Sequence, residues 1–156
     1  GISSKSYLIS TILNRLPIPE IFIQVKTDSN GVSKYEVVDG QQRLATATIL
    51  LAAIRDYFYK NNDEARAHNI EDEYLVKTDL GTLERIPKLQ LNEADNDFFL
   101  NRILSLPISE QRNISSSKES HRRIEKAGQL SSNHVTNLGT IYKDPTTQLI
   151  LLVKFI

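Results

Sequence analysis

The residues from Asp39 to Arg43, Asp-Gly-Gln-Gln-Arg, place a carboxylate, a glycine, two amides and a guanidinium directly before an alanine-rich stretch. A turn that only reverses the chain needs little more than a glycine and a capping residue. Two glutamines and an arginine at the mouth of a predicted helix therefore indicate a ligand site.

The chemistry of that site follows from the start of a helix. First-turn N–H groups have no partner within the helix, and the helix dipole adds partial positive charge there, so this end can hold a phosphate. Gly40 lets the backbone approach closely, and Gln41 and Gln42 supply neutral donors. Arg43 matches phosphate oxygens bidentately, and Thr46 adds a hydroxyl one turn along.

Asp39 needs a second explanation, because a carboxylate repels a bare phosphate. It is predicted to hold a Mg²⁺ ion that bridges to the phosphates of a nucleotide. Alternatively, it orients Arg43 or a water molecule. A purely structural interpretation also stays open, in which Asp39 caps the helix, Arg43 forms a surface ion pair and Gly40 eases the turn.

The run VVDGQQRLATATILLAAI, residues 37–54, resembles the DGQQR box of the GmrSD-type restriction endonuclease N-terminal family. The stretches ISTILNRLPIPEIF (9–22), IPKLQLNEADNDFFLNRIL (86–104) and SKESHRRIEKA (117–127) resemble the segments around that box. The similarity covers residues 7–127, which leaves 128–156 as the expected start of a helical extension. The fold that the resemblance implies is ParB-like and sulfiredoxin-like.

The resemblance also implies a function. It predicts a domain that binds and hydrolyses a nucleoside triphosphate in a modification-dependent restriction or phage-defence protein, coupled to DNA cleavage by an effector nuclease module. Asp39 and Arg43 then correspond to catalytic residues, with Gly40, Gln41 and Gln42 in the phosphate site. The alternative is a non-catalytic module that uses the same residues to bind DNA or a partner protein.

Three departures from the family pattern affect this expectation. An upstream Gln-Arg-x-Tyr-x-Trp element and a downstream Phe-Glu-x-x-Asn-x-x-Gly element are absent from the sequence. The upstream element is expected to complete the site, so a fragment without it is expected to bind weakly or not at all. Position 45 is Ala where many relatives carry Thr, which removes one hydroxyl.

The elements that position the box form an α+β pattern. Apolar periodicity predicts a helix over residues 5–16, and β-rich segments at 21–26 and 34–38 predict a hairpin. A long helix is expected from Gly40 to Tyr59, ended by Asn61 to Asp63.

The rest of the chain is predicted to be mainly helical. Residues 63–73 are charged enough for a solvated short helix or loop, and 74–76 and 88–91 are candidate short strands. Asn92 is a predicted N-cap, and Pro145 suits a first helical position. Phe98, Phe99, Ile103 and Leu104 are expected to form a buried side.

Two charged groups are further candidates. Arg122, Arg123 and Lys126, in a predicted helix after the loop 113–120, could touch a DNA backbone, although such runs are commonly solvated helix faces. The carboxylates Glu93, Asp95 and Asp97 could gather a metal, but capping and compensation of the helix dipole also explain them.

Composition limits the remaining possibilities. The 156 residues, 40% apolar and 24% charged, suit one domain, and 19 basic against 19 acidic side chains give no overall field toward nucleic acid. No cysteine is present, and no apolar run approaches a membrane span, so a cytoplasmic location is expected. The chain begins with Gly1, lacks Met and ends in an apolar run, so we expect a fragment of a longer protein.

Overall fold

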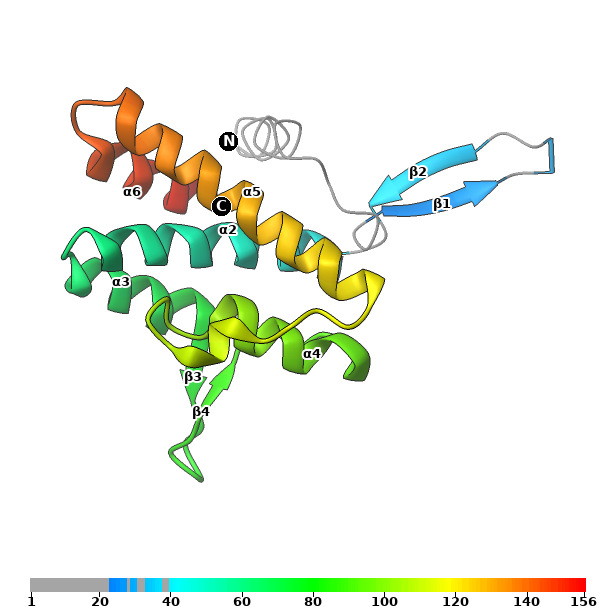
Figure 1. Ribbon diagram of the computed structural model, residues 1–156, viewed down its shortest axis with the longest axis horizontal. Helices are drawn as coiled ribbons and strands as arrows, with labels where there is room; N and C mark the ends of the chain where they lie inside the picture. Colours follow the sequence, from blue (N-terminus) through cyan, green and yellow to red (C-terminus); the bar gives the residue numbers. More distant parts are fainter. Residues whose placement is uncertain (1–22, 28, 31–32, 38–39) are drawn as a thin grey trace.

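The first described element is an antiparallel hairpin of β1 (Ile23–Thr27) and β2 (Ser33–Val37), in which Ile23 lies opposite Val37. The computed structural model, drawn in Figure 1, describes residues 23–27, 29–30, 33–37 and 40–156. The predicted hairpin is therefore confirmed. The helix predicted over residues 5–16 lies outside the described residues.

The helix α2 (Gly40–Lys60) has 21 residues and lies between α5 and the helices α3 and α4 in Figure 1. Good helix formers fill it, and most of its length from Ala45 onward is buried. Its end is as predicted: Asn62 has φ 63°, and the Asp63 N–H donates to the carbonyl of Phe58 at 2.8 Å. A left-handed residue of this kind closes a helix by satisfying its last carbonyls.

The charged stretch that follows forms α3 (Glu64–Ile70) and a π-helical turn, η2 (Glu71–Leu75). The Asp63 side chain caps α3 by accepting a first-turn N–H. Solvated structure was expected here, yet Ala67 and Ile70 are buried because α3 packs against α2. The short helix is confirmed, but full solvation is wrong.

A second hairpin consists of β3 (Val76–Thr78) and β4 (Arg85–Pro87). The strands predicted at 74–76 and 88–91 are thus misplaced. One cause is that η2 continues through Leu75. The other is the Asp79 side chain, which fixes the turn by accepting two backbone N–H groups at 2.9 and 2.8 Å.

The next helix, α4 (Glu93–Phe99), continues into a π-helical turn, η3 (Leu100–Leu104), and a 3₁₀ turn, η4 (Glu110–Asn113), follows. Asn92 caps α4 as predicted, since its side chain accepts the Asp95 N–H at 3.0 Å. All four apolar residues expected on the inner side are buried: Phe98, Phe99, Ile103 and Leu104.

Two helices complete the chain, α5 (Glu119–Ile141) and α6 (Pro145–Phe155). The predicted basic helix and the first-turn position of Pro145 are confirmed. In Figure 1, α5 crosses over α2, and α6 lies beside α5. Gly139 lets the two long helices meet, because a Cβ there would lie 2.7 Å from the Tyr57 hydroxyl oxygen.

The core lies between α2 and the helices around it. In Figure 1 the β1–β2 hairpin lies at the upper right and the β3–β4 hairpin lies below the helices, and the described part is mostly helical. This arrangement is compatible with the predicted α+β class. Among the described helices, none is both long and apolar enough to cross a lipid bilayer.

Candidate functional site

The predicted phosphate site falls at the beginning of α2. β2 ends at Val37 and α2 begins at Gly40, so the backbone from Gly40 to Arg43 belongs to a first helical turn. First-turn N–H groups are the donors on which the prediction depends. Asp39 lies outside the described residues, as do the side chains of Gln41, Gln42 and Arg43.

The next turn of α2 is described in full. Thr46 is half-buried, and Leu44 is exposed. Thr48 is buried and donates its hydroxyl to the carbonyl of Leu44 at 2.7 Å. The hydroxyl of Thr48 therefore serves the helix backbone.

The predicted DNA-binding cations lie in the first turns of α5. Arg122 is exposed and donates to the Glu119 carboxylate at 2.7 and 3.1 Å. This hydrogen bond and the Arg122 charge hold the pKa of Glu119 below its ordinary value. Arg123 is half-buried and Lys126 is exposed. Arg122 and Lys126 thus face solvent, as both a DNA-binding face and an ordinary solvated face require.

The acidic first turn of α4 is not a metal site in the described structure. Glu93 and Asp97 are exposed, whereas Asp95 is only 4% exposed. Among the residues that the structure describes, no group of three His, Cys, Asp or Glu side chains converges as metal ligands would. Asp95 instead accepts a hydrogen bond from the hydroxyl of Ser120 at 2.5 Å.

A buried histidine completes the contact between α4 and α5. The His121 ring stacks on Phe98 with centroids 4.4 Å apart, and its Nε2 lies 3.0 Å from the carbonyl oxygen of Ala94. Its Nδ1 lies 3.3 Å from the backbone N–H of Ser117. A carbonyl requires a donor and an N–H requires an acceptor, so Nε2 is matched to the carbonyl of Ala94 and Nδ1 to the N–H of Ser117. Both nitrogens are therefore occupied, and this cluster joins two helices.

A buried charged side chain also lies in the apolar part of α2, and no sequence pattern predicted it. Arg55 is fully buried and uses all five N–H groups. It donates to the carboxylates of Asp56 and Glu71 at 3.0 and 2.7 Å. It also donates at 2.8–3.2 Å to the last two carbonyls of η3, those of Ile103 and Leu104, and to that of Ser105, the residue after η3.

Arg112, in η4, lies on the other side of Asp56. Its Nη2 donates to Asp56 at 2.7 Å, so each carboxylate oxygen of Asp56 accepts from a different arginine. Its Nε donates to the carbonyl of Ser105 at 3.0 Å. Burial lowers the pKa of Arg112; Asp56 opposes that change, while the charges of Arg55 and Arg102 add to it. Positive charge is therefore crowded at this point.

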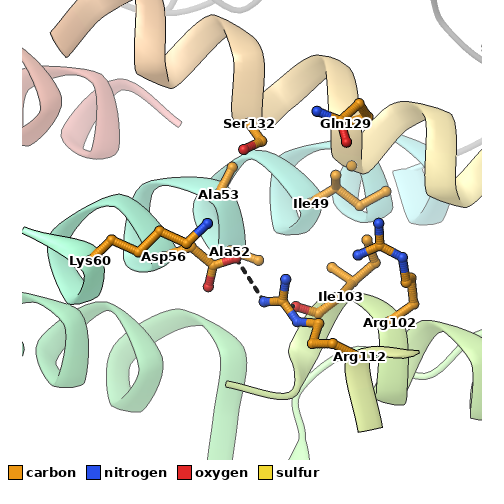
Figure 2. Close-up of a pocket in the computed structure, with 11 residues that line it drawn as sticks. Ile49, Ala52, Ala53, Asp56, Lys60, Arg102, Ile103, Arg112, Gln129 and Ser132 are labelled. Atoms are coloured by element: carbon orange, nitrogen blue, oxygen red, sulfur yellow. Dashed lines mark hydrogen bonds and ion pairs between the residues drawn. The ribbon is translucent and has the colours of Figure 1, made fainter. Parts of the chain in front are cut away.

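Asp56, Arg102 and Arg112 border a cavity of about 230 Å³ between α2, η3, η4 and α5. Figure 2 shows the Asp56–Arg112 ion pair on one wall, Arg102 beside Arg112, and Gln129 and Ser132 reaching it from α5. The polar residues that line the cavity are Asp56, Lys60, Arg102, Arg112, Gln129 and Ser132. We call this cavity the cationic pocket, because three of its side chains are basic and one is acidic.

One signal in the sequence could have pointed to the cationic pocket. Arg55 and Asp56 interrupt the otherwise apolar part of α2 from Ile49 to Phe58, and charged residues are seldom fully buried unless they are paired. The partners could not be read from spacing, since Glu71 lies 16 residues away and the carbonyls of η3 lie 48 to 50 residues away.

The fold is thus a helical α+β domain with a candidate anion site at the start of its central helix and a cationic pocket along that helix. The chain belongs to the family of the GmrSD restriction endonuclease N-terminal domain, whose family model matches residues 2–154. The resemblance seen in the sequence is confirmed. No curated protein and no solved structure matches the chain.

Proposed function

We propose that this domain binds and hydrolyses a nucleoside triphosphate, with Mg²⁺, at the start of α2. Membership of the family makes the chain a domain of a restriction or phage-defence protein. The proposal adds the chemistry of the site and its coupling to an effector nuclease module that cuts modified DNA.

The observation that carries the proposal is the position of the DGQQR residues. α2 begins at Gly40, so the pentapeptide meets unpartnered backbone N–H groups and the positive end of a 21-residue helix dipole. In the proposed site Arg43 clamps the phosphates and Asp39 holds the metal ion or positions the attacking water. Gly40, Gln41 and Gln42 bring donors to the phosphate oxygens, and Thr46 adds a hydroxyl.

A ParB-like arrangement supports the same assignment by analogy. The sequence resemblance implies a fold in which a nucleotide is gripped where a strand leads into a helix, and β2 and α2 follow one another in this order. The Mg²⁺ requirement follows from the carboxylate, because magnesium commonly joins one or two carboxylates to substrate phosphates.

A non-catalytic DNA-binding module is the second candidate function. The exposed Arg122 and Lys126 in the first turns of α5 favour it. Such a module binds DNA with an affinity that falls steeply with salt and shows no nucleotide turnover. The two candidates therefore differ in a direct measurement.

The test measures Mg²⁺-dependent release of phosphate and thermal stability with each nucleoside triphosphate. A nucleotide at about 100 times its Kd should stabilise the domain by roughly 2.7 kcal/mol. Arg43→Ala should remove both the turnover and the stabilisation, whereas Arg66→Ala, an exposed arginine in α3, should keep both. The proposal fails if Arg43→Ala behaves like the parent chain or if no triphosphate binds.

A further inference from the structure

We infer that the cationic pocket is a second binding site, for a phosphate or pyrophosphate group, separate from the start of α2. The pocket is lined by the second half of α2, from Ile49 to Lys60. Arg43 precedes Asp56 by about 20 Å along the helix axis, at 1.5 Å of rise per residue. One phosphate group cannot contact both places, so this inference does not depend on the proposed function.

The charge of the pocket favours an anion. Asp56 is already paired, because its two oxygens accept from Arg55 and Arg112. Lys60 and Arg102 form no ion pair within the part of the chain that the structure describes. Two positive charges at the pocket therefore lack a counter-charge among the described residues.

The hydrogen-bonding groups of the pocket favour an acceptor. Arg112 uses Nε and Nη2 for protein partners, while its Nη1 has no hydrogen bond to any described residue. The Ser132 hydroxyl and the Gln129 amide come from the opposite wall, on α5. A cationic ligand would be repelled here, and an apolar ligand would leave charged donors without partners.

Charge and size together select the phosphate class. A phosphate monoester carries about 1.5 to 2 negative charges at pH 7 and presents three acceptor oxygens in different directions. This negative charge of up to two matches the two positive charges of Lys60 and Arg102, whereas a carboxylate carries a single negative charge. The volume of about 230 Å³ is below the roughly 300–1,000 Å³ of pockets for drug-sized ligands. The pocket therefore suits one or two phosphate groups.

Titration calorimetry of the whole chain at low ionic strength, with sodium pyrophosphate and inorganic phosphate as probes, tests the inference. Lys60→Gln and Arg102→Gln should each weaken pyrophosphate binding by about tenfold or more, since each removes a charge-assisted hydrogen bond. Lys60 is exposed and Arg102 is half-buried, so the variants should fold. Lys143→Gln, an exposed lysine between α5 and α6, is the charge-matched control.

Arg43→Ala separates this site from the proposed nucleotide site: any pyrophosphate held at the start of α2 should be lost in this variant, whereas the binding that depends on Lys60 and Arg102 should persist. A repeat with ADP in the Arg43→Ala chain distinguishes the source of the phosphate: equal affinity points to the phosphate tail of a nucleotide, and weaker binding points to free pyrophosphate. Either result supports the pocket.

Three outcomes overturn the inference. The parent chain fails to bind either probe at millimolar concentration, or Lys143→Gln loses as much affinity as the two pocket variants. In the third, Arg43→Ala abolishes binding while the pocket variants retain it, which would place pyrophosphate at the start of α2.

Discussion

Arg55 shows how one buried charge can organise the helical part of this domain. Its guanidinium joins α2 to Glu71 of η2 and to the last carbonyls of η3, which otherwise end without intrahelical donors. A positive charge at the end of a helix is also favoured by the helix dipole. Because all five donors are used, Arg55 has a structural role, while Arg112 keeps a donor for the pocket.

Replacing Arg55 should therefore cost far more than replacing an exposed arginine. Arg55→Met leaves the Glu71 carboxylate without its charged partner, and loss of one partner of a buried pair costs about 3–5 kcal/mol. Arg66→Met, which removes an exposed pair with Asp63, should change the free energy of unfolding by no more than about 1 kcal/mol. Urea unfolding measures both.

A second change checks the cause of that loss. Glu71→Gln in the Arg55→Met background removes the orphaned charge and should recover part of the lost stability. If the double variant is less stable than Arg55→Met, the cost does not come from the carboxylate of Glu71.

At the scale of elements, the contact between α2 and α5 depends on Gly139. A Cβ at this position would lie 2.7 Å from the Tyr57 hydroxyl oxygen and 2.8 Å from a ring carbon of the same side chain. Alanine is the better helix former by about 1 kcal/mol, but overpacking commonly costs about 1–3 kcal/mol. We expect Gly139→Ala to destabilise the domain.

The sign of this effect should reverse when the ring is removed. In a Tyr57→Ala background, Gly139→Ala meets no ring and should stabilise by up to about 1 kcal/mol through helix propensity. Thermal or urea unfolding of the parent chain, the two single variants and the double variant gives the coupling free energy between positions 57 and 139. Equal effects of Gly139→Ala in both backgrounds would rule out the ring as the obstacle.

The start of α6 should respond to acid. The Asp144 side chain caps the helix, and its hydrogen bonds to the side chain and backbone N–H of Thr147 hold its pKa below the ordinary 3.8. Since the folded pKa is the lower one, the stabilisation is present above pH 3.8 and is lost as the pH falls through the folded pKa.

Hydrogen exchange of the Thr147 amide should therefore show protection that decreases below pH 3.8, after correction for the intrinsic rate. Asp144→Asn is the control, because asparagine caps a helix without titrating. Protection that decreases equally in both chains would assign the acid response to another group.

Sequence patterns predicted the elements that depend on local chemistry. The cap at Asn92, the first-turn Pro145 and the break around Asn62 each follow from neighbouring residues, and all three are confirmed. The strands β3 and β4 were misplaced because the side chain of Asp79 and the turn η2 set their positions. Weak strand propensity over three residues cannot outweigh such contacts.

The two candidate sites also differ in whether neighbouring residues or distant contacts form them. The box at Gly40 to Arg43 was found because its residue types are unusual for the start of a helix, and its chemistry stays a prediction. The cationic pocket was missed because Lys60, Arg102 and Arg112 come from three elements that only the fold brings together. Side chains that only tertiary packing brings together have no regular spacing in the sequence, so a sequence pattern cannot reveal the site that they form.

For the whole molecule, the described core predicts which part of the chain folds by itself. Among the residues whose burial is described, the buried members of the core cluster lie between Ala45 and Leu152, and apart from Leu89 they are on helices that pack around α2. A chain of residues 40–156 should therefore keep its helical circular dichroism and unfold in one cooperative transition. It should still bind pyrophosphate in the cationic pocket but lose nucleotide binding, because Asp39 and the β1–β2 hairpin are absent. A broad transition with binding of a hydrophobic dye would show instead that residues 1–39 contribute to the core.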